Sequence, residues 1–177
     1  MRKRLLIVIA AAGIVGCNQA STAPSPAPLK EPAAAAAGQV GSRLPDFSVK
    51  DLQGRELSAA GLHGKVVLID FWATWCQPCK KEMPGYQKLL NRYGPRGFVV
   101  IGFKFDTMVD SEDPLQFARK IGVRYPLAVA PDELKRRFGG IEGLPTTMLY
   151  DRQGILRKKV VGFEHTEVFE AELAPLL

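Results

Sequence analysis

Short apolar runs alternate with amphipathic stretches over most of the chain, and this alternation predicts a sheet flanked by helices. Residues 66–71 and 98–103 are mainly apolar, which is typical of strands buried on both faces. A helix is expected between them, from about Cys79 to Tyr93, kinked by Pro84 and ended by the Gly-Pro pair that follows. A strand, a helix and a strand in this order predict two parallel strands joined by a crossover helix.

Further elements are predicted on both sides of this unit. Before it, residues 44–49 and 55–57 form a small hairpin around a polar Asp-Leu-Gln-Gly turn. After it, the predicted elements are a helix from Pro114 to about Ile121, a strand at 127–129, a helix at 131–138, a hairpin of residues 146–150 and 155–161, and a closing helix at 166–173. The fold class is therefore α/β, with a mixed central sheet, helices on both faces, an N-terminal β-hairpin and an insert between the central strand-helix units.

The first forty residues lack this pattern, and their composition predicts export. Residues 1–4 are basic and residues 5–15 apolar, which is typical of an export signal and too short for an ordinary membrane span. Residues 14–17 resemble the bacterial lipoprotein cleavage box, so residues 1–16 are the expected signal peptide and Cys17 the expected lipid anchor. An ordinary secretory signal cut slightly later and a retained N-terminal span are the alternatives.

The segment after the signal is predicted to be a tether. Residues 17–40 consist mostly of Ala, Pro, Ser, Thr and Gln and cannot form a core, so we expect a lipid-anchored, disordered arm. Residues 41–177 have globular composition and are expected to form one domain. The formal charge of +6 falls to about +3 without the signal, which is too small to indicate a nucleic-acid partner.

The candidate chemistry lies in two cysteines three residues apart, Cys76 and Cys79, which follow the first apolar run. If Cys79 opens a helix, Cys76 lies at the N-terminus of that helix, where free N–H groups and the positive end of the dipole favour a thiolate. Closing so small a ring would stabilise the fold by only about 2 kcal/mol. Reversible redox chemistry therefore explains the pair better than a structural disulfide does.

Two other interpretations of the cysteine pair have less support in the sequence. A zinc site normally needs four ligands, and only His63, His165 and the distant Cys17 remain, none of them in a paired spacing. Two inert core thiols are the remaining alternative. One thiol pair in an exported chain fits a compartment where disulfides persist.

Three motifs in order give the domain its resemblance to a known family: residues 71–82 around the cysteine pair, Pro84, and residues 143–147. On these residues the chain resembles the thioredoxin superfamily, and most closely its exported, membrane-tethered thiol-disulfide oxidoreductases of the TlpA/ResA type. The resemblance implies a thioredoxin-like fold over residues 41–177. It also implies dithiol-disulfide exchange without a bound cofactor or metal.

The resemblance assigns roles to particular residues. It implies that Cys76 is the exposed attacking thiol, that Cys79 is the buried resolving thiol, and that Pro145 is in the cis form beside them. The backbone at Leu144 would then pair with an extended substrate segment. The full set of expected substrate-binding residues is Trp75, Gln77, Pro78, Leu144 and Pro145.

Two acidic residues are candidate proton carriers. Asp70, on the predicted buried strand, matches the thioredoxin aspartate that accepts a proton from the resolving thiol, although many tethered relatives carry Asn there. Glu82, three residues after Cys79, matches the acid that tunes the thiols in ResA-like proteins. A carboxyl desolvated near sulfur has a raised pKa, which suits proton transfer near neutral pH. In the alternatives, Asp70 is bonded to nearby backbone and Glu82 is a solvated acid in the first turn of the helix.

Several neighbouring residues are expected to have no catalytic role. Trp72 is predicted to pack in the core, whereas Lys80 and Lys81 are predicted on a solvated helix face. His165, near the start of the last helix, is expected at the surface.

The sequence therefore predicts an exported, lipid-anchored enzyme in the bacterial cell envelope, facing the periplasm or another extracytoplasmic space. Its expected partners are thiols and disulfides of exported proteins, for example apocytochrome c, and a membrane electron donor of the DsbD/CcdA type. A thiol peroxidase of the peroxiredoxin type is one alternative, although no proline network precedes Cys76. A Sco-like copper module using Cys76, Cys79 and His165 is another, although those proteins usually space their cysteines one residue wider.

Overall fold

The computed structural model describes residues 37–105 and 112–177. The predicted signal peptide at 1–16, the predicted lipid anchor at Cys17 and most of the predicted tether at 17–40 lie outside these residues. Within the two described ranges, no helix has the length and apolar character that crossing a bilayer requires.

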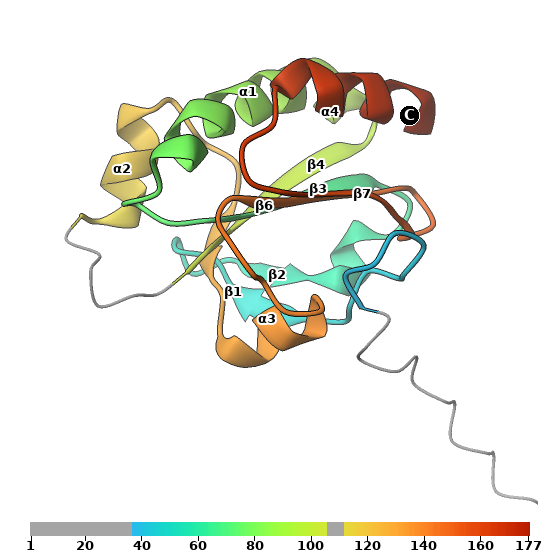
Figure 1. The fold of residues 1–177 in the computed structure, drawn as a ribbon, viewed down its shortest axis with the longest axis horizontal. Helices are drawn as coiled ribbons and strands as arrows, with labels where there is room; N and C mark the ends of the chain where they lie inside the picture. Colours follow the sequence, from blue (N-terminus) through green and yellow to red (C-terminus); the bar gives the residue numbers. More distant parts are fainter. Residues whose placement is uncertain (1–36, 106–111) are drawn as a thin grey trace, which may run out of the picture. The chain divides into compact units, whose positions relative to one another are not determined.

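A five-stranded mixed sheet forms the centre of the domain, in the spatial order β5-β4-β3-β6-β7 (Figure 1). β3, β4 and β5 are parallel, while β6 is antiparallel to both β3 and β7. All seven residues of β3 are buried, which explains the uninterrupted apolar run in the sequence. The strands are β3 (Val66–Trp72), β4 (Phe98–Lys104), β5 (Leu127–Val129), β6 (Thr146–Tyr150) and β7 (Leu156–Val161).

Helices cover both faces of this sheet, as predicted. One face carries α1 (Gln77–Tyr93), α2 (Pro114–Lys120) and α4 (Thr166–Leu173). The other face carries α3 (Asp132–Arg137) and the hairpin of β1 (Ser48–Lys50) and β2 (Glu56–Ser58) (Figure 1). Three short 3-10 helices complete the domain: η1 (Ala59–Leu62), η2 (Gly94–Arg96) and η3 (Ala174–Leu176).

The pleat of β3 divides its side chains between two cores. Leu68 and Trp72 pack with α1, α2 and α4, whereas Val67, Ile69 and Phe71 pack on the opposite face. Because side chains alternate along a strand, Asp70 points to the same side as Leu68 and Trp72, beneath α1.

A glycine allows α1 and α4 to approach closely. A Cβ atom built at Gly85 would lie 1.9 Å from Oγ1 of Thr166, the first residue of α4. A larger residue at position 85 would therefore push the two helices apart. The close contact holds the segment before α4 near the first half of α1.

An aspartate stabilises each of the two hairpin turns through the same set of hydrogen bonds. Asp51 and Asp151 each accept hydrogen bonds at Oδ1 from the backbone N–H groups two and four residues later, at 2.8–2.9 Å. The second oxygen of each binds the Nε of an arginine, Arg55 at 2.7 Å and Arg157 at 2.6 Å. These carboxylates fix the turns that the Gly-containing sequences predict.

The first predicted strand is displaced. It begins at Ser48 instead of residue 44, and the N–H of Leu44 donates to the carbonyl of Gly154 at 2.7 Å. The N–H of Gly41 donates to the carbonyl of Leu156, and the N–H of Leu156 donates to the carbonyl of Ser42, both at 2.8 Å. Residues 41–42 thus hydrogen-bond to the start of β7, a pairing that local sequence does not reveal.

Candidate active site

A disulfide joins Cys76 and Cys79 at the start of α1, with the two Cα atoms 5.3 Å apart. Cys76 is the residue that caps the helix, and its sulfur accepts a hydrogen bond from the N–H of Cys79 at 3.3 Å. The helix therefore begins at Gln77, two residues earlier than predicted, with Pro78 in the first turn, where a missing N–H costs nothing.

This placement favours a thiolate on Cys76 once the disulfide is reduced. The sulfur lies at the positive end of the helix dipole, next to N–H groups that have no partner within the helix. The hydrogen bond from the Cys79 N–H to the Cys76 sulfur would become stronger once that sulfur is negatively charged.

The two cysteines differ less in exposure than the sequence suggests. Cys76 is only 3% exposed in the disulfide and Cys79 is fully buried, because both pack into the core beneath α1. The expectation of an openly exposed Cys76 is therefore wrong for the oxidised form. Cys76 is nevertheless the member of the pair that reaches solvent.

We call the five expected substrate-binding residues the active-site rim: Trp75, Gln77, Pro78, Leu144 and Pro145. Leu144 is half-buried against the same core cluster as the two cysteines, and Pro145 is buried. Trp75 is 47% exposed, and Gln77 and Pro78 are exposed beside it. The Leu144–Pro145 peptide bond is cis, as the resemblance implies.

Two exposed apolar side chains lie at the end of β7 next to the rim, and no sequence motif predicts them there. The N–H of Gly162 donates to the carbonyl of Pro145 at 2.7 Å, which fixes the end of β7 against this loop. Val161 and Phe163, on either side of Gly162, are 50% and 44% exposed. Sequence reasoning missed both residues because their position depends on this long-range hydrogen bond.

Asp70 is completely buried on β3, directly opposite Gly102 of β4 and Thr147 of β6. Neither of its carboxyl oxygens has a hydrogen-bond partner among the described residues. The alternative in which Asp70 is bonded to nearby backbone is therefore wrong. Burial raises the pKa of Asp70 to about 8, so the carboxyl is mainly protonated at neutral pH.

Glu82 is buried as well, at 2% exposure, so the alternative of a solvated first-turn acid is wrong. Its Oε2 accepts a hydrogen bond from the N–H of Glu164 at 3.4 Å, whereas Oε1 has no partner within the described ranges. Burial, followed by the nearby charge of Asp70, raises the pKa of Glu82 to about 9. We call Asp70 and Glu82 the buried carboxyl pair.

Two neutral polar residues border the buried carboxyl pair. The hydroxyls of Tyr86 and Thr147 share a hydrogen bond at 3.1 Å. Burial, together with the charges of Asp70 and Glu82, raises the pKa of Tyr86, which therefore stays a neutral hydroxyl. The sequence contains a signal for Tyr86, since it follows Glu82 by four residues and so lies on the same face of α1.

The expectations for Trp72 and His165 are confirmed, whereas the expectation of a solvated lysine face holds for Lys81 and is wrong for Lys80. Trp72 is buried and stacks on Phe117 with ring centroids 5.3 Å apart. His165 is exposed at the residue before α4. Lys81 is exposed, whereas Lys80 is half-buried with its Nζ 5.4 Å from the centroid of the Phe117 ring.

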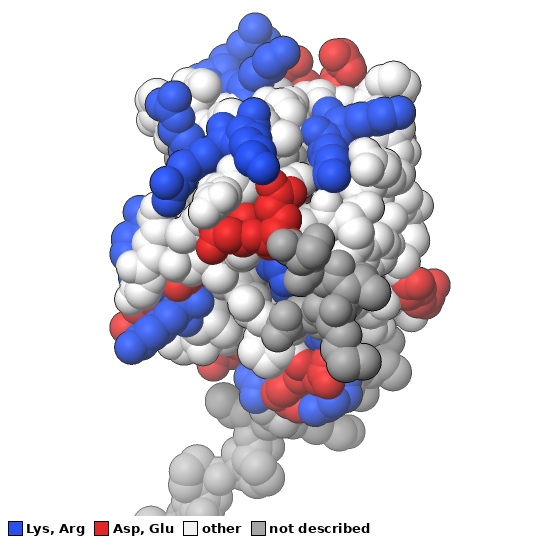
Figure 2. Space-filling view, turned by 90° about the vertical axis from the view of Figure 1, so that its left-hand side faces the viewer, with Lys and Arg blue, Asp and Glu red and all other residues white. Residues whose placement is uncertain are grey.

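The side of the molecule that carries α2 exposes many positive charges. The contact between Lys80 and Phe117 joins the first turn of α1 to α2. On the side of the molecule that carries α2, Lys and Arg side chains gather over the upper part, above a smaller group of Asp and Glu (Figure 2). This surface attracts anionic groups, and the attraction weakens with salt.

The comparison with protein families identifies the domain. A family model described as the AhpC/TSA family matches residues 40–159. The chain belongs to this family. The match includes both cysteines, the buried carboxyl pair and the Leu144–Pro145 loop.

The chain's relatives include a thiol-disulfide oxidoreductase and a thioredoxin-like protein. The chain is 33% identical over 138 residues to "Thiol-disulfide oxidoreductase ResA" of Bacillus thuringiensis strain Al Hakam, across 76% of this chain and 77% of the relative. It is 32% identical over 136 residues to "Thioredoxin-like protein YneN" of Bacillus subtilis strain 168, across 76% and 79%. Among AhpC/TSA members, the chain is thus a homologue of thiol-disulfide oxidoreductases of the ResA type.

A solved structure confirms the thioredoxin-like fold. A thiol:disulfide interchange protein of the thioredoxin family from Chlorobium tepidum TLS superposes with a TM-score of 0.69 at 29% sequence identity. The match covers 79% of this chain and 99% of that protein. This AhpC/TSA domain therefore has the predicted architecture.

Proposed function

We propose that this protein reduces disulfides of exported proteins by dithiol-disulfide exchange through Cys76 and Cys79. The observation that supports the proposal most is the placement of the cysteine pair. Cys76 caps α1, and the fully buried Cys79 packs on the face of the sheet that also carries the buried carboxyl pair, whose pKa values are raised by burial.

The reaction proceeds in two exchanges. The Cys76 thiolate attacks a client disulfide, which forms a mixed disulfide and releases one client thiolate. Cys79 then gives its proton to ionised Asp70 and attacks the sulfur of Cys76. The bond between the two cysteines forms, the bond to the client breaks, and the second client sulfur leaves as a thiolate that takes a proton from water.

The buried carboxyl pair supports the return of the protein to its reduced form. When a donor thiolate opens the Cys76–Cys79 bond, Cys79 leaves as a thiolate inside the core. A protonated Asp70 or Glu82 supplies the proton that neutralises it, and the raised pKa values keep that proton available near neutral pH. We expect a membrane electron donor of the DsbD/CcdA type to supply the electrons.

Clients would bind along the active-site rim. Trp75, Gln77 and Pro78 provide exposed surface beside Cys76, and the backbone at Leu144 would pair with an extended client segment. Pairing through backbone groups gives affinity with little sequence selectivity. Apocytochrome c is one client that such a site could accept.

The protein would act outside the cytoplasm. The basic and apolar start of the chain and the lipoprotein-like residues 14–17 support cleavage after residue 16 and attachment of lipid to Cys17. Residues 17–40 would then hold the domain at a distance from the membrane surface.

The equilibrium potential of the cysteine pair against glutathione tests the direction of electron flow. We expect a value of about −270 mV, as for thioredoxin, because a potential this low makes the dithiol a reductant. A value of about −120 mV would instead identify an oxidant. Insulin reduction by the reduced protein is the accompanying activity assay, and consumption of peroxide at a comparable rate would favour the peroxidase alternative.

A further inference from the structure

Four buried side chains beneath α1 present polar atoms that find no hydrogen-bond partner within residues 37–105 and 112–177. They are both oxygens of Asp70, Oε1 of Glu82, Nε1 of Trp72 and the hydroxyl of Tyr125. Buried polar groups are nearly always paired, and an unpaired group costs about 1–3 kcal/mol. Two donors and two acids in one core therefore call for a functional explanation.

A glycine brings the two donors next to Asp70. Gly102 lies opposite Asp70 in the sheet, and the side chains of Leu127, Trp72 and Tyr125 fill the space that a side chain at position 102 would take. A Cβ atom built at Gly102 would lie 2.9 Å from Nε1 of Trp72 and 3.2 Å from Cε2 of Tyr125. Because Cε2 is bonded to the carbon that carries the hydroxyl, the hydroxyl end of the Tyr125 ring lies over Gly102, the residue opposite Asp70 in the sheet.

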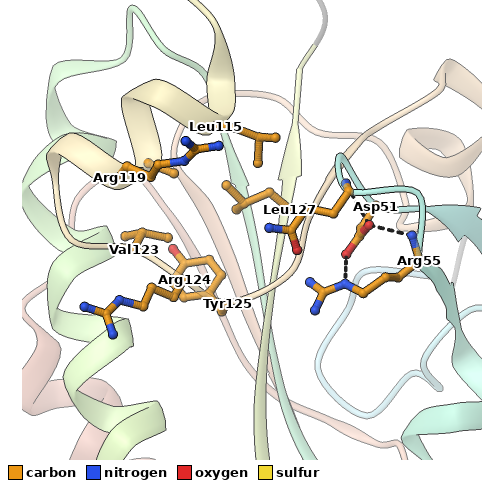
Figure 3. A pocket seen from close by; sticks show the side chains of 10 residues that line it. Asp51, Arg55, Leu115, Arg119, Val123, Arg124, Tyr125 and Leu127 are labelled. Atoms are coloured by element: carbon orange, nitrogen blue, oxygen red, sulfur yellow. Dashed lines mark hydrogen bonds and ion pairs between the residues drawn. The ribbon is translucent and has the colours of Figure 1, made fainter.

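Tyr125 also borders a hollow that is open to solvent. The hollow, of about 250 Å³, lies between α2 and the turn after β1, and Figure 3 shows Tyr125 among its lining residues with Val123 and Leu127. The residue itself is 3% exposed. Burial, followed by the charge of Asp70, raises the pKa of Tyr125, so the group is a neutral hydroxyl that can donate.

We propose that Tyr125 is a positioning residue for the buried carboxyl pair, and that its hydroxyl donates a hydrogen bond to the ionised form of Asp70. This inference rests on the proposed function. The hydrogen bond stabilises the carboxylate that takes the proton of Cys79 while Cys79 attacks Cys76. Tyr125 keeps its own proton throughout, so the balance of the two exchanges is unchanged.

The other ionisable groups around Asp70 leave this role open to Tyr125. From α1, Glu82 adds a like charge, and the hydroxyl of Tyr86 is hydrogen-bonded to the hydroxyl of Thr147. From β4, Lys104 lies two residues beyond Gly102 on the same face, and its Nζ donates to the carbonyl of Phe105 at 3.1 Å.

The test follows the resolving step directly. Reduced protein mixed with Ellman's disulfide releases one coloured thiolate when Cys76 attacks and a second when Cys79 resolves the adduct. The rate of the second release should rise with pH as Asp70 ionises. In Tyr125→Phe we expect the midpoint of this profile to move upward by about one pH unit, because a hydrogen bond to the charged form is lost.

Two comparisons separate this role from simple packing. Tyr150→Phe removes another buried hydroxyl, which donates to Sδ of Met148 at 3.4 Å on the opposite face of the sheet, and should leave the midpoint unchanged. In an Asp70→Asn background, Tyr125→Phe should have no further effect on the profile, since the two residues act together.

Three results would overturn the inference: an unchanged midpoint in Tyr125→Phe, an equal shift in Tyr150→Phe, or a shift that persists without Asp70. If Tyr125→Phe does not fold, 3-fluorotyrosine placed at position 125 replaces it. This nearly isosteric, stronger donor should move the midpoint to lower pH, and no movement contradicts the inference. Wild-type protein that releases only one thiolate would instead contradict the proposed function.

Discussion

Replacing Cys76 with alanine should abolish insulin reduction, with a loss of about 10³-fold or more, because the fully buried Cys79 cannot replace it as the first nucleophile. Cys79→Ala should also stop turnover, but for a different reason. Its Cys76 thiolate still attacks, and the mixed disulfide then persists because the resolving sulfur is missing. Non-reducing electrophoresis with mass spectrometry should therefore find client adducts on Cys79→Ala and none on Cys76→Ala.

The double variant Cys76→Ala/Cys79→Ala is the control for adducts formed through other cysteines. Equal amounts of adduct on the two single variants would contradict the assigned roles. The two positions would then be interchangeable, although one caps α1 and the other lies in the core.

Asp70→Asn should change the pH dependence of stability as well as that of catalysis. Burial raises the pKa of Asp70 from its ordinary value of 3.8 to about 8, so the folded state binds more protons than the unfolded state between these pH values. Stability must then fall as pH rises through this window, by up to about 1.4 kcal/mol per pH unit for the one group. An asparagine carries no such penalty, and the variant should be more stable than wild type at pH 8.

Urea unfolding of the oxidised protein at several pH values between about 5.5 and 8.5 measures this difference. We expect the two free energies of unfolding to diverge by about 2 kcal/mol or more across the range, with the variant less dependent on pH. Asp46→Asn, at an exposed position, is the matched control and should follow wild type. Parallel curves for wild type and Asp70→Asn would show that Asp70 is ionised in the folded state.

The order of the elements and the cysteine pair could be predicted because their signals are local. The apolar run of β3 reflects burial on both faces, and the two cysteines follow directly at a helix start. The start of α1 was misplaced by two residues because the sulfur of Cys76 takes the capping role that a hydroxyl or carboxylate usually fills.

The surroundings of the disulfide could not be predicted because they depend on contacts between distant segments. Glu82 is buried partly because the segment before α4 lies against it, where the N–H of Glu164 reaches its carboxyl. Gly85 permits this packing, yet a glycine after a proline indicates only a weak helix position in the sequence. Likewise, the sequence shows only that Tyr125 is an aromatic residue before a strand. Its position over Gly102, opposite Asp70, depends on contacts between distant segments.

Alkylation of the reduced protein across a pH series tests the central claim most directly, namely that one sulfur is both reachable and easily ionised. Iodoacetamide labelling located by mass spectrometry should modify Cys76 first, with half of its maximal rate reached well below the ordinary thiol pKa of about 8.5. Cys79 should stay unlabelled until the protein unfolds. Equal, slow labelling of both cysteines at every pH would contradict the account.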